Sequence, residues 1–145
     1  MVTNRREIHI EWGDCDPAGF VYFPRYFEYF DSCTNWLFEC AGLHKPEMMK
    51  TYGIVGIPLV DARAQFLLSS AFGETVVVET CIKEWGRTSF TVQHRLYKGD
   101  VLAVEAFEKR VWAVRSEDIS KRIKSHPIPQ EVKDRFMAES PKQQA

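Results

Sequence analysis

Four segments in which apolar and polar residues alternate occupy the middle of this chain, and they limit the folds open to it. They are residues 59–68, 75–85, 89–98 and 101–115. Alternation at every second residue is the pattern of a strand with one face on a core. Residues 98–100 (Lys-Gly-Asp) are typical of a tight hairpin turn, and the last segment is long enough for one bent strand or two consecutive strands. The sequence therefore predicts an antiparallel sheet.

A single long helix is expected ahead of these strands. Pro24 suits the first turn of a helix, the helical pattern runs to Ala41, and Gly42 is placed as the left-handed residue that ends it. The apolar residues of this helix form a broad, aromatic face: Tyr26, Phe27, Phe30, Cys33, Leu37 and Ala41. Such a wide face predicts a helix wrapped by a sheet. Residues 46–52 predict a short helix or turn that Gly53 ends.

The order of these elements predicts the fold class. Residues 7–13 alternate and predict a strand before the helix, with Trp12 among its inward residues. In residues 59–68 one side of the strand is expected to be apolar: Val60, Ala62, Ala64, Phe66 and Leu68. Strand, helix and four or so long strands make an α+β fold with one principal helix on an antiparallel sheet. Three consecutive valines, 76–78, predict burial on both faces there, and an oligomer contact is one explanation.

Length and composition bound the remaining possibilities. A chain of 145 residues predicts one domain, 1–145, with its core over about 7–136 and a frayed polar tail at 139–145. A net charge of -1 and the lack of a binding motif argue against nucleic-acid or membrane partners. The four cysteines have no Cys-x-x-Cys spacing, which predicts free thiols. No signal peptide or membrane-spanning run is present, so we expect a soluble cytoplasmic protein.

The segment between the first strand and the helix, residues 14–19 (Asp-Cys-Asp-Pro-Ala-Gly), is the main candidate site. Pro17 disfavours helical geometry in Asp16, so we expect Asp16 to be extended, with its carboxylate pointing away from the local backbone. The helix that follows offers unpaired amide donors and the positive end of its dipole. The alternative is a turn in which Asp14 and Asp16 cap local amides. A metal site is disfavoured because no third oxygen ligand follows at loop spacing.

Four motifs resemble the 4-hydroxybenzoyl-CoA thioesterase family. They are residues 13–19, Phe23-Pro24-x-Tyr26, residues 53–56 (Gly-Ile-Val-Gly) and residues 81–85 (Cys-Ile-Lys-Glu-Trp), and the resemblance spans about 7–115. It implies a hot-dog fold, in which a long antiparallel sheet wraps a central helix. It also implies dimers or dimers of dimers (homotetramers), with active sites at subunit interfaces. The implied reaction is hydrolysis of an acyl-CoA thioester, with coenzyme A as part of the substrate and no other cofactor.

The resemblance also assigns roles to residues of the motif. Asp16 matches the catalytic aspartate, which acts either as a nucleophile through an acyl-enzyme anhydride or as a general base. Pro24 has no N–H, so the backbone N–H of Phe23 is the implied donor to the carbonyl oxygen. For Asp14 we keep the capping role.

An acyl pocket is implied along the helix and a facing strand, with Gly19, Tyr22, Tyr26, Asp31 and Ile57 as its residues. Gly19 would leave room for the thioester. Asp31 matches an acidic position that can accept a hydrogen bond from the distal hydroxyl of an aromatic ring, and a solvated surface residue is the alternative. The two tyrosines have core packing as their alternative. The density of aromatic residues suits an aryl or bulky acyl group, so an aromatic or medium-sized acyl group is expected. Ile57 departs from the hydroxybenzoyl branch, which tends to have a small polar residue at that position.

Coenzyme A contacts are implied for the loop that carries Arg87, Thr88 and Ser89, of which only Arg87 is basic. Other cations could contact the phosphates or simply be solvated: Lys109, Arg110, Arg115, Lys121, Arg122 and Lys124. His94, in a strand, is expected to be structural and half-buried. The predicted function is an acyl-CoA thioesterase, and the alternative is a non-catalytic acyl-CoA-binding or assembly protein of the same fold. A dehydratase of this fold is disfavoured because residues 24–41 contain no histidine.

Overall fold

The computed structural model describes residues 1–138, in which five strands form one antiparallel sheet with the order β1-β3-β4-β5-β2. The strands are β1 (Thr3–His9), β2 (Leu59–Phe66), β3 (Thr75–Trp85), β4 (Ser89–Lys98) and β5 (Val101–Val111). A two-residue turn joins β4 to β5, because Lys98 pairs with Val101. The predicted sheet is confirmed. The frayed tail predicted for residues 139–145 lies outside the described residues.

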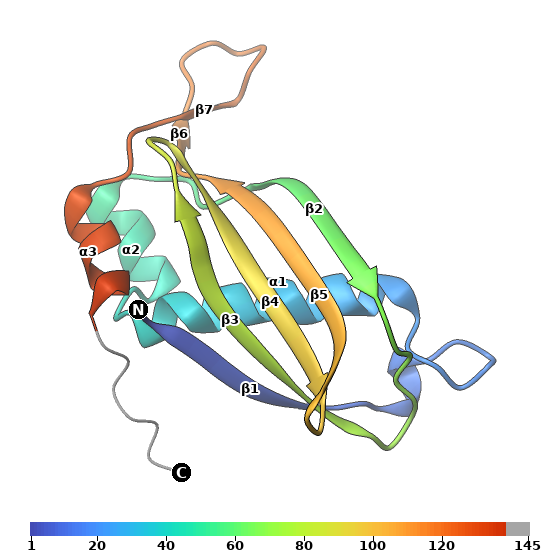
Figure 1. Cartoon of the computed structure of the whole chain (residues 1–145). Coiled ribbons are helices and arrows are strands. Elements are labelled where there is room, and N and C mark those ends of the chain that lie inside the picture. Colours follow the sequence, from blue (N-terminus) through green and yellow to red (C-terminus); the bar gives the residue numbers. More distant parts are fainter. Residues whose placement is uncertain (139–145) are drawn as a thin grey trace.

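Helix α1 (Phe23–Cys40) lies across one face of this sheet, as Figure 1 shows. Pro24 is in its first turn, and Gly42 follows it with φ of 77°. One side of α1 is buried: Tyr26, Phe30, Cys33, Thr34, Leu37 and Phe38. Because the sheet wraps this one principal helix, the protein has the α+β, hot-dog arrangement expected from the sequence.

Two shorter helices cover one end of the sheet, α2 (Lys45–Tyr52) and α3 (Gln130–Met137) (Figure 1). Gly53, with φ of 64°, ends α2 as predicted. After β5 the chain forms β6 (Ala113–Arg115), so residues 101–115 make two consecutive strands. The strand β7 (Ile123–Ser125) pairs with β6 in a separate small sheet.

The core has two clusters that share α1. One lies beside α2 and α3, where Phe38, Phe90 and Phe136 pack together with the buried Trp112. The other lies at the start of α1 and contains Tyr26, Phe30, Val76, Val78 and Leu96. A single helix therefore ties the two ends of the sheet together through apolar burial.

The first strand differs from its prediction. It was expected over 7–13, but β1 covers Thr3–His9 because its backbone pairs with β3 from Thr3 opposite Cys81 to His9 opposite Thr75. The chain then forms the 3-10 helix η1 (Trp12–Asp14). Trp12 is therefore not inward-facing: it is 63% exposed and lies edge-on against Phe72. Backbone pairing with the long strand β3, rather than the alternation of apolar residues in 7–13, therefore determines where β1 begins and ends.

Strand β2 lies at the edge of the sheet, and its side chains are mostly exposed. Val60, Phe66 and Leu68, three of the residues expected on its apolar side, are 58%, 47% and 45% exposed. Within residues 1–138, β2 is hydrogen-bonded only to β5, and Phe66 at its end contacts Tyr26 and Phe27 of α1. Val77 is likewise half-buried, so its predicted burial on both faces is not achieved within a single chain.

Candidate active site

Asp16 is the first residue of a tight turn. The Gly19 N–H donates to the Asp16 carbonyl at 2.9 Å, and the Asp16 N–H donates to the Phe20 carbonyl at 2.9 Å. Asp first, Pro second and Gly fourth is a favoured sequence for a four-residue turn. One carboxylate oxygen, Oδ1, accepts the Ala18 N–H at 2.9 Å. The carboxylate therefore does not point wholly away from the backbone as expected: one oxygen caps the turn, and the other has no hydrogen bond within residues 1–138.

Gly19 takes part in this turn through its backbone conformation. Its φ is 84°, a region that glycine enters without strain, and an added Cβ would meet no atom within 4 Å. Space around its Cα is therefore not what requires a glycine in this chain. The backbone conformation requires it, and the predicted role of Gly19 in leaving room for a thioester stays a prediction.

Asp14 links the turn to α1. Its Oδ2 accepts the Glu11 N–H at 3.0 Å, which confirms its predicted capping role, and its carbonyl accepts the Tyr22 N–H at 2.8 Å. The residues on either side of the turn, Cys15 and Val21, form an antiparallel bridge. The Asp16 turn and the start of α1 are thus held at one corner of the molecule by backbone hydrogen bonds.

The first turn of α1 leaves an amide donor at this corner. The Arg25 N–H donates to the Tyr22 carbonyl at 2.8 Å, and Pro24 has no N–H. The Phe23 N–H has no acceptor within residues 1–138. Such a donor, at the positive end of a helix dipole, is suited to a developing negative charge. The corner thus combines a carboxylate oxygen with an unpaired amide.

Aromatic side chains surround the corner. Phe20, Tyr22 and Phe23 are 47%, 52% and 61% exposed, and the turn is anchored by a hydrogen bond from the Phe72 N–H to the Gly19 carbonyl. Tyr26, in contrast, is 4% exposed and packs against Phe66 with 5.2 Å between ring centroids. Of the predicted pocket residues, Gly19 and Tyr22 lie around Asp16, whereas the side chain of Tyr26 belongs to the core beneath it.

Asp31 lies in a second region, farther along α1. A groove of about 390 Å³ there is lined by Phe27, Glu28, Asp31, Ser32, Leu59, Glu108 and Arg110. The side chain of Asp31 is 60% exposed, and its Oδ1 accepts a hydrogen bond from Arg110 Nη2 at 2.8 Å. Asp31 is therefore more than a solvated surface residue. Ile57 is 4% exposed, and its carbonyl accepts Arg110 Nη1 at 3.1 Å.

A buried polar network lies behind Asp31. Arg110 Nη2 donates to Glu108 Oε2 at 2.9 Å, and His94 Nε2 lies 3.0 Å from Glu108 Oε1, as the donor because a carboxylate only accepts. His94 Nδ1 lies 2.8 Å from the Thr80 hydroxyl, and the Thr34 hydroxyl donates to Glu108. Burial alone would raise the pKa of Glu108, but hydrogen bonds from His94 and Arg110 outweigh it and hold that pKa at about 2.

The sequence had placed two members of this network differently. His94 is fully buried rather than half-buried, and its ring stacks on Phe30. Arg110 was grouped with cations that contact phosphate or water, but it is only 5% exposed. The missed signal is the alternation in β5, which places Glu108 and Arg110 on the same inward face as the buried Ala106. Charged residues at inward positions indicate a buried pair.

The loop of Arg87, Thr88 and Ser89 joins β3 to β4 at the far end of the sheet. The Asp16 turn lies beside the start of β3, where the Ile10 N–H donates to the Glu74 carbonyl, and Arg87 follows its end (Figure 1). A strand of 11 residues spans roughly 35 Å. Helix α3 helps to hold this loop, because Lys133 Nζ donates to the Gly86 carbonyl at 3.0 Å. One chain therefore does not bring the loop and Asp16 together.

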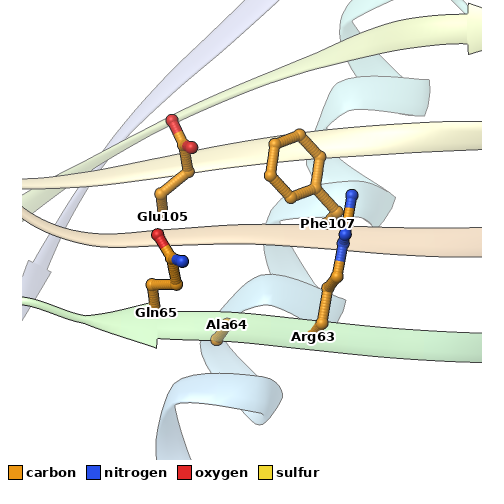
Figure 2. A pocket seen from close by; sticks show the side chains of 5 residues that line it. All are labelled: Arg63, Ala64, Gln65, Glu105 and Phe107. Atoms are coloured by element: carbon orange, nitrogen blue, oxygen red, sulfur yellow. The ribbon is translucent and has the colours of Figure 1, made fainter.

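A hollow on the outer face of the sheet contains none of the predicted site residues. Figure 2 shows its lining residues, Arg63, Ala64, Gln65, Glu105 and Phe107. The Arg63 guanidinium and the Lys83 ammonium lie 4.8 Å and 4.5 Å from the centre of the Phe107 ring. These are cation–π contacts on a solvated sheet face. No start of a described helix lies among its lining residues, so Asp16 stays the candidate site.

Two further observations concern the described part of the chain. Residues 1–138 contain no group of three or more His, Cys, Asp or Glu side chains arranged to hold a metal ion. No helix among them is long and apolar enough to cross a membrane. The cysteines Cys15, Cys33, Cys40 and Cys81 are all free, as predicted.

Comparison with known proteins identifies the class of protein that this fold and site define. The family model of the Thioesterase-like superfamily matches residues 10–136, and the chain belongs to this superfamily. A curated relative, the 4-hydroxybenzoyl-CoA thioesterase of Pseudomonas sp. (strain CBS-3), is 36% identical over 126 residues, which cover 83% of this chain and 87% of that protein.

Solved structures agree with this assignment. The structure of the 4-hydroxybenzoyl CoA thioesterase from Pseudomonas sp. strain CBS-3 matches with a TM-score of 0.84 and 31% identity, over 93% of this chain and 99% of that one. A gentisyl-coenzyme A thioesterase matches with a TM-score of 0.78 and 28% identity, over 93% and 100% of the two chains. The predicted family and hot-dog fold are confirmed, and the protein is a thioester hydrolase.

Proposed function

We propose that this protein hydrolyses aromatic acyl-CoA thioesters, with Asp16 as the reactive carboxylate and the Phe23 N–H as the donor to the carbonyl oxygen. The observation that carries this proposal is the corner where the Asp16 turn is hydrogen-bonded to the start of α1, beside an amide without an acceptor. The relatives named above act on 4-hydroxybenzoyl-CoA and gentisyl-CoA, which supports an aromatic acyl group.

The chemistry follows from the two groups at this corner. Oδ1 of Asp16 is engaged by the Ala18 N–H, which fixes the carboxylate and leaves Oδ2 for the reaction. Oδ2 either attacks the thioester carbon and displaces coenzyme A as the thiolate, giving an anhydride that water then hydrolyses to the acid and free Asp16, or takes a proton from a water that attacks that carbon while the thiolate leaves. In both routes negative charge develops on the carbonyl oxygen, and one preorganised amide donor lowers the barrier by about 3–4 kcal/mol.

A second chain completes the proposed site. Strand β2 exposes apolar side chains and an unpaired edge, and aromatic residues around Asp16 are exposed as well, which is the surface expected of a contact between copies. We assign the protein as a homodimer or a dimer of dimers. The loop at Arg87 is far from Asp16 in its own chain. In the oligomer, this loop then contacts the coenzyme A phosphates of a substrate bound at the Asp16 of a neighbouring chain.

The remaining assignments follow from the reaction. Coenzyme A enters as part of the substrate, and hydrolysis of an activated acyl group requires no other cofactor. The four free thiols suit the reducing cytoplasm, where acyl-CoA is made and used. The acyl group lies along α1, where Asp31 faces the groove and accepts a hydrogen bond from a ring hydroxyl.

Release of free coenzyme A tests the proposal. A panel of 4-hydroxybenzoyl-, 2,5-dihydroxybenzoyl-, benzoyl- and medium-chain acyl-CoA is offered to the protein, and the thiol is measured with a chromogenic reagent. Hydrolysis of an aromatic member, lowered about 10²- to 10⁴-fold by Asp16→Asn, is expected. Hydrolysis that survives Asp16→Asn would exclude the catalytic role of Asp16. Binding without any hydrolysis would favour the non-catalytic alternative. A monomeric solution mass would exclude the two-chain site.

A further inference from the structure

Arg110 joins the sheet to α1 at the groove beside Asp31. Its guanidinium makes four hydrogen bonds: two to Glu108, one to the Ile57 carbonyl and one to Asp31 Oδ1. The side chain of Arg110 is 6% exposed, whereas that of Asp31 is 60% exposed. Three of the four hydrogen bonds thus fix Arg110 inside the protein, and the fourth reaches an otherwise exposed carboxylate.

The shared nitrogen determines where Asp31 lies. Arg110 Nη2 donates both to Asp31 Oδ1, at 2.8 Å, and to Glu108 Oε2, at 2.9 Å. An exposed aspartate on a helix would otherwise exchange between rotamers. The Arg110 guanidinium is fixed by Glu108 and the Ile57 carbonyl, so its hydrogen bond holds Asp31 in one rotamer. Its positive charge also offsets the repulsion between the Asp31 and Glu108 carboxylates. The second oxygen of Asp31, Oδ2, accepts no hydrogen bond within residues 1–138 and is available to a ligand in the groove.

We propose that Arg110 is the specificity-determining positioning residue of this enzyme: it holds the Asp31 carboxylate so that Oδ2 selects acyl groups that carry a distal hydroxyl. This inference rests on the proposed function, because it assumes that an acyl group enters the groove. A ligand hydroxyl donates to Oδ2, and a ring without a hydroxyl leaves that oxygen without its partner. A hydrogen bond to a charged group is worth about a tenfold difference in affinity or more.

Non-hydrolysable ligands test this role without relying on catalysis. The probes are S-(4-hydroxybenzyl)-coenzyme A and S-benzyl-coenzyme A, two thioethers that differ by one hydroxyl, and their dissociation constants are measured by titration calorimetry. We expect the wild-type protein to bind the hydroxylated thioether at least about tenfold more tightly. Asp31→Asn and Arg110→Lys should each reduce this preference to about twofold or less, with little change in the affinity for the benzyl thioether.

A double-substitution cycle separates positioning from general structural support. If Arg110 acts through Asp31, Arg110→Lys produces no further loss of preference in the Asp31→Asn protein. Arg95→Lys is the matched control, because Arg95 pairs with Glu105 on the outer face of the sheet and should leave the preference unchanged. Thermal unfolding of each variant, in parallel, confirms that the folded protein is being titrated. Arg110→Gln, combined with Glu108→Gln, serves instead if Arg110→Lys does not fold.

The outcomes are distinct from those of the hydrolysis assay. Equal affinity of the wild-type protein for the two thioethers, or no binding of either, would overturn the inference even if an aromatic acyl-CoA is hydrolysed. Equal weakening of both thioethers by Arg110→Lys would also overturn it, since a purely structural residue has that effect. Absence of thiol release together with a hydroxyl preference that depends on Arg110 would overturn the proposed function and support the specificity role.

Discussion

The Asp16 turn and the network around Glu108 are both polar, but they are built in opposite ways. The carboxylate of Asp16 is held by an amide two residues away, and the turn is closed by the Gly19 N–H three residues away, with one distant anchor from the Phe72 N–H to the Gly19 carbonyl. Glu108 is held by Thr34 and His94, which are 74 and 14 residues away, and by Arg110 on the same strand. The turn is half-exposed, whereas Glu108 is 4% exposed.

The two regions are therefore stabilised in different ways, one by local hydrogen bonds and the other by long-range partners. A turn closed by local hydrogen bonds costs little to expose and gains little from the rest of the fold. A buried charge is stable only while all of its partners remain, because the carboxylate has left water. The proposed reactive carboxylate, Asp16, can therefore be altered at little cost in unfolding free energy, whereas altering the buried network costs several kcal/mol.

The largest effect is expected from Glu108→Ala. This change leaves Arg110 buried with only one of its carboxylate partners, and breaking a buried pair in this way costs about 3–5 kcal/mol of unfolding free energy. Chemical denaturation at fixed protein concentration measures it. Glu105→Ala is the control on the same strand, where the pair with Arg95 is exposed and should cost less than about 1 kcal/mol. Similar losses of unfolding free energy for the two variants would contradict the claim that the buried pair contributes more than the exposed one.

Acid should weaken the same network. The pKa of Glu108 is about 2 in the folded protein, below its ordinary value of 4.5, so the stability it provides is complete above about pH 4.5 and is lost as the pH falls toward 2. The integrated effect is about 3 kcal/mol. The difference in unfolding free energy between the wild-type protein and Glu108→Gln, measured from pH 6 to pH 2.5, should shrink accordingly. A constant difference would show that Glu108 does not titrate as described.

A smaller effect is expected in the turn from Gly19→Ala. The φ of 84° forces an alanine into the left-handed region at a cost of about 1–2 kcal/mol, although no atom obstructs its Cβ. Gly13→Ala is the matched control, because its φ lies outside that region and its Cβ also meets nothing within 4 Å. Thermal denaturation should therefore show a lower midpoint for Gly19→Ala only. An equal drop in the midpoint for Gly13→Ala would mean that any alanine in this loop lowers stability, whatever the φ of the residue it replaces.

The smallest effect is expected from Asp14→Ala. It removes one capping hydrogen bond to the Glu11 N–H, worth about 0.5–1 kcal/mol, and leaves the Asp14 carbonyl bonded to Tyr22. Denaturant unfolding and thiol release measured on the same preparation should show a slight loss of stability and a nearly unchanged rate. A loss of activity comparable to that of Asp16→Asn would assign the chemistry to both carboxylates.

The same contrast explains what could be predicted from the sequence. The Asp16 motif, the start of α1 at Phe23 and Pro24 and the alternating strands depend on residues close together in the chain, so their patterns are visible in it. The position of Asp31 against Arg110, and of His94 against Glu108, depends on which strands become neighbours. The start of β1 was misplaced for the same reason, because its pairing with β3 decides it. The alternation in β5 was the one local hint of the buried network.

The hydrogen bonds between the C-terminal segment and the rest of the chain have a consequence for proteolysis. Helix α3 is hydrogen-bonded to two segments at the same end of the sheet: Lys133 donates to the Gly86 carbonyl, and the Val2 N–H donates to the Phe136 carbonyl. A cut between residues 126 and 129 would leave α3 held by non-covalent contacts alone, so the loop of Arg87 and the first residues of β1 should loosen together. The Asp16 turn, at the opposite end of the sheet, would keep every hydrogen bond it has. A nicked enzyme should therefore lose the proposed coenzyme A contacts of the Arg87 loop before it loses the arrangement of the Asp16 turn.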